Sequence, residues 1–187
     1  MASAPKKHPT FVTRRLRVRP FRASDAKALH LLYGDAENLR YWGTDPSPSA
    51  QRTRKMMSWH LGYRPRNYVL WAVEEIKSRR LVGMINYHRR ELREKRVDVG
   101  WLILPEMQGK GYMTEAGQAL LRHLIDDLGV HKVEALIREE NKASAALARR
   151  LGFRLEGGPI RDRWLVGGKW HNVMLYGLIA GEERVSR

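Results

Sequence analysis

The chain of 187 residues contains no cysteine. This absence excludes a disulfide framework, a metal site built on thiolates and a cysteine nucleophile, and it is typical of proteins from a reducing compartment. No apolar run is long enough to cross a bilayer, and the N-terminal residues carry charges without the apolar centre of a signal peptide. We therefore expect a cytoplasmic protein that does not enter a membrane.

Acidic residues are also scarce, since 20 Asp and Glu face 35 Lys and Arg and leave a formal net charge of +15. Such a surface attracts polyanions, so a phosphate-rich cofactor and an RNA-containing assembly would both suit it. The basic residues lack the aromatic spacing of an RNA-binding sheet motif, and no zinc-ligand spacing is present. A dedicated nucleic-acid reader is therefore the weaker interpretation, and no metal is expected.

The length of the chain predicts a single domain, and no internal repeat or low-complexity block divides it. We expect a basic, flexible N-terminal segment over residues 1–12, one folded domain over residues 13–182, and a short tail over residues 183–187. Hydrophobic periodicity predicts an α/β sandwich around a mixed sheet. The expected strands cover residues 16–20, 68–73, 81–87, 97–104, 133–137, 154–164 and 173–178.

Four helices are expected between these strands. Ser24 and Ser49 are predicted to cap the first two, and Asn141 the last, because short polar side chains accept hydrogen bonds from the first turn. The third follows Gly111 and continues to Gly129, where glycine favours a stop.

The segment from Trp101 to Ala119 carries the most specific pattern, WLILPEMQGKGYMTEAGQA. It predicts a buried strand that breaks at Pro105, crosses a turn with two glycines and enters a helix. Gly109 and Gly111 allow positive φ and close approach of an anion, and the first N–H groups of the helix point at that anion. The run is neither the nucleotide-binding GxxxxGK[ST] nor a complete GxGxxG.

This turn is similar to the [QR]-x-x-G-x-[GA] pattern of the GNAT acetyltransferase superfamily at every position except the last, where Met113 replaces a small residue. Four further segments resemble the family in the family's own order: RRLRVRPFRASDA, LVGMINYH, NKASAALARRLGF and GKWHNVMLYGL. Within the superfamily, the chain resembles the Rim-type branch of ribosomal-protein N-terminal acetyltransferases. The resemblance implies the GNAT fold, an α/β fold with a mixed, mostly antiparallel central sheet flanked by helices.

The resemblance also implies transfer of an acetyl group from acetyl-CoA to a primary amine by direct attack in a ternary complex. In the family, the central strand separates from its neighbour near the position of Leu102, Ile103 and Leu104, whose backbone groups would bind the pantetheine arm and the acetyl oxygen. The turn would hold the pyrophosphate; its residues are Gln108, Gly109, Lys110, Gly111, Tyr112 and Met113.

The catalytic residues follow from the same resemblance. Many members protonate the leaving thiolate with a tyrosine, but the matching residue here is Ala148, and the Rim-type branch offers a serine that matches Ser144. Asn141 would contact the pantetheine. Asp98 is the first candidate for the general base. The alternatives are plain helix capping for Asn141 and Ser144, and an ion pair with an arginine-rich neighbouring strand for Asp98.

Glu37, Tyr41 and Trp42 lie in the early helical region that forms the acceptor pocket in the family, and His171 could relay a proton. Core packing is the alternative for the aromatic residues. Some Rim-type enzymes carry a carboxylate where this chain has Arg163, which puts a ribosomal-protein acceptor in doubt. The sequence leaves open a protein N-terminus, a polyamine, an amino acid or an antibiotic as acceptor. It also leaves open a non-catalytic module that binds RNA or ribosomes, and a homodimer.

Overall fold

A computed structural model describes residues 8–61 and 68–182, so the predicted tail and the first seven residues lie outside the described part. Its strands form one eight-stranded sheet with the order β1-β2-β3-β4-β5-β6-β8-β7. Within the described residues β5 and β6 pair in parallel, and every other neighbouring pair is antiparallel. The strands are β1 (Phe11–Val12), β2 (Leu16–Pro20), β3 (Tyr68–Glu75), β4 (Leu81–Glu91), β5 (Arg96–Ile103), β6 (Lys132–Arg138), β7 (Arg154–Val166) and β8 (Lys169–Ile179).

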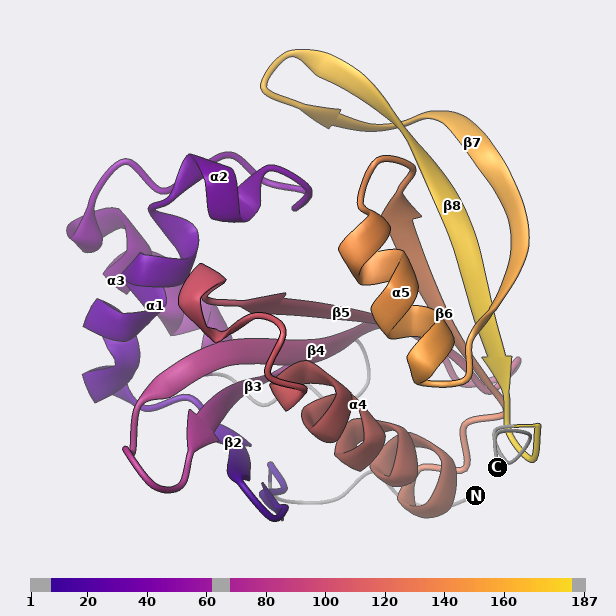
Figure 1. The fold of residues 1–187 in the computed structure, drawn as a ribbon, viewed down its shortest axis with the longest axis horizontal. Helices are drawn as coiled ribbons and strands as arrows, with labels where there is room; N and C mark the ends of the chain where they lie inside the picture. Colours follow the sequence, from indigo (N-terminus) through magenta and orange to yellow (C-terminus); the bar gives the residue numbers. More distant parts are fainter. Residues whose placement is uncertain (1–7, 62–67, 183–187) are drawn as a thin grey trace.

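Helices cover both faces of this sheet, which confirms the predicted α/β class (Figure 1). The helices are α1 (Ala26–Tyr33), α2 (Ala36–Leu39), α3 (Ala50–His60), α4 (Tyr112–Arg122) and α5 (Lys142–Arg150), with a π-helical continuation of α4 at His123–Asp127. On β4, Gly83 lies against Met113 of α4, whereas Asn86 lies beside Gly100, which faces Trp42 after α2. Since residues 83 and 86 point to opposite faces of the strand, α4 and the α1–α2 region lie on opposite sides of the sheet.

Trp71 of β3 is fully buried on the α4 face, where its ring contacts those of Phe11, Tyr87 and His123. Its indole N–H donates to the carbonyl oxygen of Pro9 at 2.9 Å. Residues 8–12 therefore contact the domain through β1 and Trp71, within the segment that the sequence analysis expects to be flexible.

Two of the three predicted helix caps are confirmed. Ser49 accepts a hydrogen bond from the N–H of Arg52 at 3.2 Å, and Asn141 accepts one from the N–H of Ser144 at 3.0 Å. The cap predicted at Ser24 is wrong, because residues 23–25 form a 3₁₀ turn and Asp25 accepts the hydrogen bond from the N–H of Arg22 at 2.7 Å. No helix in the described part of the chain is long and apolar enough to cross a membrane.

Candidate active site

The central feature of the site is the separation of β5 from β6. The two strands pair in register only at Arg96, Val97 and Asp98, whereas β5 continues to pair with β4 as far as Ile103. From Val99 onward, one edge of β5 therefore has no neighbouring strand within the described residues. This is the strand separation that the family resemblance implies, although it begins three residues before Leu102.

The direction of the backbone groups decides which residues of β5 can use this open edge. The N–H of Leu104 donates to the carbonyl oxygen of Val82 on β4 at 2.9 Å. Because alternate residues of an antiparallel ladder face the same neighbour, Leu102 and Leu104 direct their backbone groups to β4, and Trp101 and Ile103 direct theirs to the open edge. Of Leu102, Ile103 and Leu104, predicted to bind the pantetheine arm, Ile103 is thus the one that directs its backbone groups to the open edge, and Trp101, which the sequence analysis did not name, directs its own the same way.

The turn after β5 adopts the predicted conformation. Gly109 has φ 73° and Gly111 has φ 75°, values that other residues rarely adopt. Gly111 is the N-cap of α4, so the free N–H groups of the first helical turn begin directly after it. A side chain at position 109 would meet no other residue, which leaves the space in front of the turn open.

Three side chains that the sequence analysis did not single out hold this turn in place. Arg15 donates to the carbonyl oxygen of Lys110 at 2.9 Å and forms an ion pair with Glu115 of α4 at 2.7 Å. The hydroxyl of Tyr112 donates to the carboxylate of Glu75 at the end of β3. Because the side chain of Tyr112 is used in this way, its backbone N–H is the part available to an anion.

Met113 is the one position where the turn departs from the family pattern. Its side chain is 5% exposed, and its Cε lies 3.0 Å from the place that a Cβ at Gly83 would occupy. The methionine therefore packs beneath β4 into the space left by a glycine. The side chain points into the core and leaves the front of the turn unobstructed.

Ser144, in the first turn of α5, lies next to Trp101 on the part of β5 that has the open edge. The indole N–H of Trp101 donates to its Oγ at 2.7 Å, and Asn141 caps the helix that carries it. An indole N–H can only donate, so Ser144 accepts in this contact and its own hydroxyl proton remains available to another acceptor. Ala148, at the place of the family tyrosine, is fully buried.

Asp98 is the last residue of β5 that pairs with β6, and it is only 3% exposed. Burial raises the pKa of its carboxyl, and the attraction of Arg89 opposes this shift. Arg89 donates to Oδ2, while Oδ1 has no hydrogen-bond partner within the described residues. The ion pair considered from the sequence therefore exists, and one carboxylate oxygen remains to accept a proton.

Asp98 shares its face of the sheet with a short row of polar side chains. His88 pairs with it across β4, with Nε2 4.0 Å from Oδ2 of Asp98 and Nδ1 3.1 Å from Oδ1 of Asn86. Burial, and secondarily Arg89, lowers the pKa of His88 to about 4, so its imidazole is neutral near pH 7. A side chain at Gly100 would lie 3.2 Å from Asn86 and 3.4 Å from Trp42, so the absence of one leaves room between these residues.

The structure brings some of the predicted acceptor residues to this face. Trp42 reaches Gly100 on β5, and Tyr41 stacks against Arg138 at the end of β6. Glu37 is exposed and forms an ion pair with Arg40 at 2.9 Å, so its carboxylate faces solvent at the rim. His171 pairs with Trp164 across the β7–β8 hairpin. Within the described residues, it makes no hydrogen bond or ion pair with another predicted site residue.

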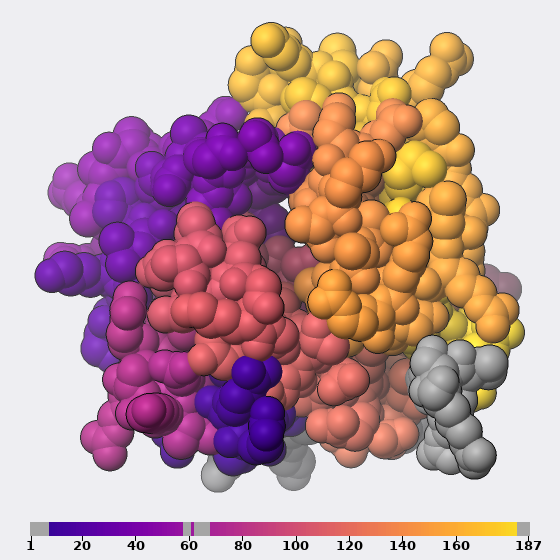
Figure 2. Space-filling model, in the orientation of Figure 1, coloured from indigo at the N-terminus to yellow at the C-terminus, as the bar shows by residue number. Residues whose placement is uncertain are grey.

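A hollow lies between the segments that carry several of these residues (Figure 2). Figure 2 shows it between the segment that follows α1, the segment that follows β5, and α5. Trp101 of β5 and the hydroxyl of Ser144 meet on the α5 side of the sheet. Trp42 lies against Gly100 on the other face of the sheet. The described residues contain no group of three or more His, Cys, Asp or Glu that could hold a metal ion.

Comparison with known proteins identifies this arrangement. The acetyltransferase (GNAT) domain family matches residues 15–154. An uncharacterized N-acetyltransferase of Bacillus subtilis, YoaA, is 24% identical over 176 residues, which cover 94% of this chain and 99% of that protein. The spermidine N(1)-acetyltransferase of Escherichia coli is 25% identical over 161 residues, which cover 85% of this chain and 83% of that enzyme.

A third relative, the E. coli alanine N-acetyltransferase of ribosomal protein uS5, is 36% identical over 80 residues, 43% of this chain and 41% of that enzyme. The crystal structure of a GNAT acetyltransferase from Bacillus anthracis superposes with a TM-score of 0.80 at 25% identity and covers 91% of this chain and 98% of its own. With the fold, the separated strand and the glycine turn in agreement, this chain belongs to the GNAT family of acetyltransferases, which use acetyl-CoA.

Proposed function

We propose that this protein transfers the acetyl group of acetyl-CoA to a protein or peptide N-terminal amine by direct attack in a ternary complex. The observation that carries the proposal is the open edge of β5 leading into the Gly109–Gly111 turn. The turn and the first N–H groups of α4 bind the pyrophosphate, and the outward backbone groups of Trp101 and Ile103 bind the pantetheine and the acetyl oxygen.

Two side chains handle the protons in this proposal. The acceptor ammonium loses a proton to Asp98, directly or through water, and the free amine attacks the thioester carbon. The carbon–sulfur bond then breaks and the hydroxyl of Ser144 protonates the leaving thiolate, while the second proton of the attacking nitrogen, released as the amide forms, returns to the serine oxygen. The raised pKa of Asp98 and the free hydroxyl proton of Ser144 support these roles.

The net charge of the protein is the reason for proposing a peptide N-terminus as acceptor rather than a polyamine. A surface of +15 repels polyamines and cationic antibiotics at long range, although screening limits this effect to about 8 Å at physiological salt. Polyamines are the second candidate, because the match to the spermidine N(1)-acetyltransferase covers 85% of this chain and because Asp98 and Glu134 place buried carboxylates on the proposed acceptor face.

A competition assay separates the two acceptors. Thiol release from acetyl-CoA is measured with spermidine and with short peptides that have free N-termini, each at low and high salt. We expect a higher kcat/KM for a peptide, and a rate with spermidine that rises with salt as the repulsion is screened. Far more efficient acetylation of spermidine at every salt concentration would overturn the choice of acceptor and leave the acetyltransferase assignment intact.

A further inference from the structure

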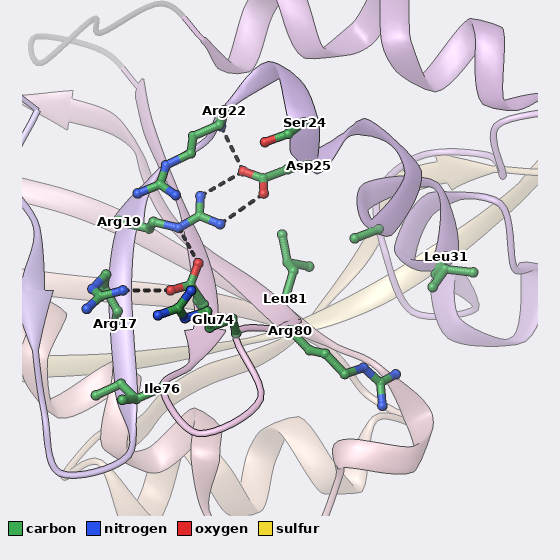
Figure 3. Close-up of a pocket in the computed structure, with 12 residues that line it drawn as sticks. Arg17, Arg19, Arg22, Ser24, Asp25, Leu31, Glu74, Ile76, Arg80 and Leu81 are labelled. Atoms are coloured by element: carbon green, nitrogen blue, oxygen red, sulfur yellow. Dashed lines mark hydrogen bonds and ion pairs between the residues drawn. The ribbon is translucent and has the colours of Figure 1, made fainter.

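A second cavity lies away from the proposed active site, between α1, β2 and the turn that joins β3 to β4. Its volume is about 630 Å³, within the usual range for small-molecule sites. Figure 3 shows Arg17, Arg19 and Arg22 along the β2 side, with Leu31 of α1 and Arg80 of the turn across from them.

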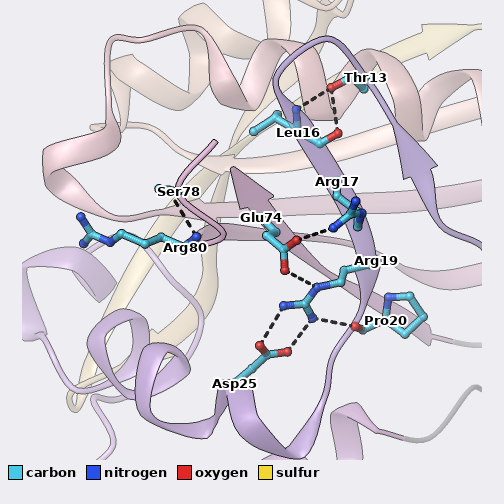
Figure 4. Close-up of polar contacts among 9 residues, drawn as sticks. All are labelled: Thr13, Leu16, Arg17, Arg19, Pro20, Asp25, Glu74, Ser78 and Arg80. Carbon is cyan, nitrogen blue, oxygen red and sulfur yellow. Dashed lines mark hydrogen bonds and ion pairs between the residues drawn. The ribbon is translucent and has the colours of Figure 1, made fainter. Parts of the chain in front are cut away.

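The floor of the cavity is a fixed ionic network. The guanidinium of Arg19, 4% exposed, donates to both carboxylate oxygens of Asp25 at 2.7 and 2.9 Å and to Glu74 at 2.7 Å. Arg17 donates to the other oxygen of Glu74 at 2.9 Å (Figure 4). Both carboxylates are therefore saturated by Arg17 and Arg19, and they do not neutralise the remaining cations of the lining.

Those remaining cations are Arg22, Arg79 and Arg80. Neither Arg22 nor Arg79 forms an ion pair within residues 8–61 and 68–182, and Arg80 makes one exposed pair with Glu106 at 3.5 Å. Five arginines against one Asp and one Glu give the lining a net charge of +3. Partial enclosure by low-dielectric walls strengthens the attraction of such a charge for an anion.

Arg79 adds an independent observation. Its φ is 57°, in the left-handed region that glycine or asparagine would normally occupy in a turn. A residue held in such a conformation at a cost in stability is a common mark of a functional position. Here the strained residue is one of the unpaired cations of the lining.

Apolar side chains also line the cavity, between the arginines (Figure 3). Ala28 and Leu31 of α1, with Ile76 and Leu81 beside the turn, line the cavity, and Leu31 is 55% exposed to solvent. A purely inorganic anion would leave these apolar side chains unused. The unpaired guanidinium groups of Arg22 and Arg79, together with that of Arg80, whose one ion pair is exposed, favour a dianion over a single carboxylate, since arginine forks match phosphate oxygens.

We propose that this cavity binds a phosphate ester with an apolar or planar body, of about the size of a nucleoside monophosphate. The cavity lies on the α1 side of the sheet, whereas α4 lies on the other side, and its one link to the segment before the coenzyme turn within the described residues is the exposed pair of Arg80 with Glu106. A small molecule fits the enclosed shape better than an extended RNA strand, which would need a groove rather than a cavity.

The test is calorimetry with adenosine monophosphate on the full chain, saturated beforehand with coenzyme A so that the coenzyme site is filled. We expect one molecule bound per chain, with an affinity at least about tenfold lower in Arg79→Gly and in the double variant Arg22→Gln/Arg80→Gln. Arg93→Gln, which removes an exposed arginine outside the cavity, is the matched control and should bind as the parent does.

Arg79→Gly also relieves the positive φ, so it should melt no lower than the parent, and lost binding in it cannot be attributed to unfolding. Inorganic phosphate should bind more weakly than adenosine monophosphate, because it leaves the apolar side chains of the cavity unused. Absence of binding by the parent chain, equal loss in Arg93→Gln, or a short single-stranded RNA as the only ligand that the cavity variants weaken would each overturn the proposal.

Discussion

At the scale of single residues, the proposed chemistry depends on a hydroxyl whose hydrogen-bonding role is set by a neighbour. Trp101 fixes Ser144 as an acceptor, so the serine proton is free for the thiolate. We expect Ser144→Ala to lower kcat by roughly 10- to 100-fold with little change in coenzyme affinity, since the proton is needed late in the reaction. Steady-state kinetics and calorimetry on the same preparation measure both effects. Trp101→Phe, which keeps the serine, is the control and should lose less; an unchanged kcat in Ser144→Ala would reduce the serine to a helix residue.

Asp98 offers a second test at this scale. Burial raises the pKa of its carboxyl, and the nearby Arg89 reduces this rise without cancelling it. The carboxylate acts as a base only above its pKa. Asp98→Asn should therefore move the acidic limb of the kcat/KM profile to higher pH, where the acceptor amine is already deprotonated in solution. Arg89→Gln should move the same limb upward by a smaller amount, since it removes the cation that opposes the raised pKa. Glu94→Gln, at an exposed pair, is the control, and a profile that does not move in Asp98→Asn would remove this residue from the mechanism.

At the scale of elements, α5 depends on one cap. Asn141→Ala should cost about 1 kcal/mol of unfolding free energy, because the N–H of Ser144 loses its acceptor. Asn141→Asp keeps an acceptor at the same place and should retain stability. If coenzyme affinity falls in the aspartate variant while its denaturation midpoint stays, Asn141 contacts the coenzyme as predicted; an affinity equal to that of the parent would leave it with capping alone.

Most elements could be predicted from local signals. Alternation predicts β2, apolar runs predict β3 to β6, and the glycines at 111, 129, 167 and 168 mark turns in which they adopt positive φ. The β8 strand begins at Lys169 rather than at 173, and Trp170 in this early part is 59% exposed, so no inward face signals a strand there. Contacts between residues far apart in the sequence could not be predicted from local patterns. Glu115 binds Arg15, 100 positions away, and Trp101 donates to Ser144, 43 positions away.

At the scale of the whole molecule, two half-buried histidines make stability depend on pH. Burial lowers the pKa of His8 and of His88 from 6.5 to about 4. The unfolded chain therefore binds protons below pH 6.5 that the folded chain does not, and the unfolding free energy should fall as the pH falls from 6.5 toward 4. Asp98 acts in the opposite sense, since its raised pKa lets the folded state take up a proton first.

Denaturant titrations at several pH values between 6.5 and 5 measure this slope while the carboxylates with lowered pKa, Glu75 and Glu115, stay ionised. His88→Gln should flatten the slope relative to that of the parent. A slope equal to that of the parent in His88→Gln would show that His88 titrates normally in the folded protein.

The most direct test of the account is the affinity for coenzyme A of Gly111→Val, measured by calorimetry. Valine would place a branched side chain at a φ of 75° where the N–H groups of α4 meet the pyrophosphate, so binding should be lost. Gly129→Val carries the same kind of backbone strain, at φ 65°, at the far end of that helix, and it should bind coenzyme A as the parent does at a temperature where both variants are folded. Parent-like affinity in folded Gly111→Val would contradict the placement of acetyl-CoA at this turn.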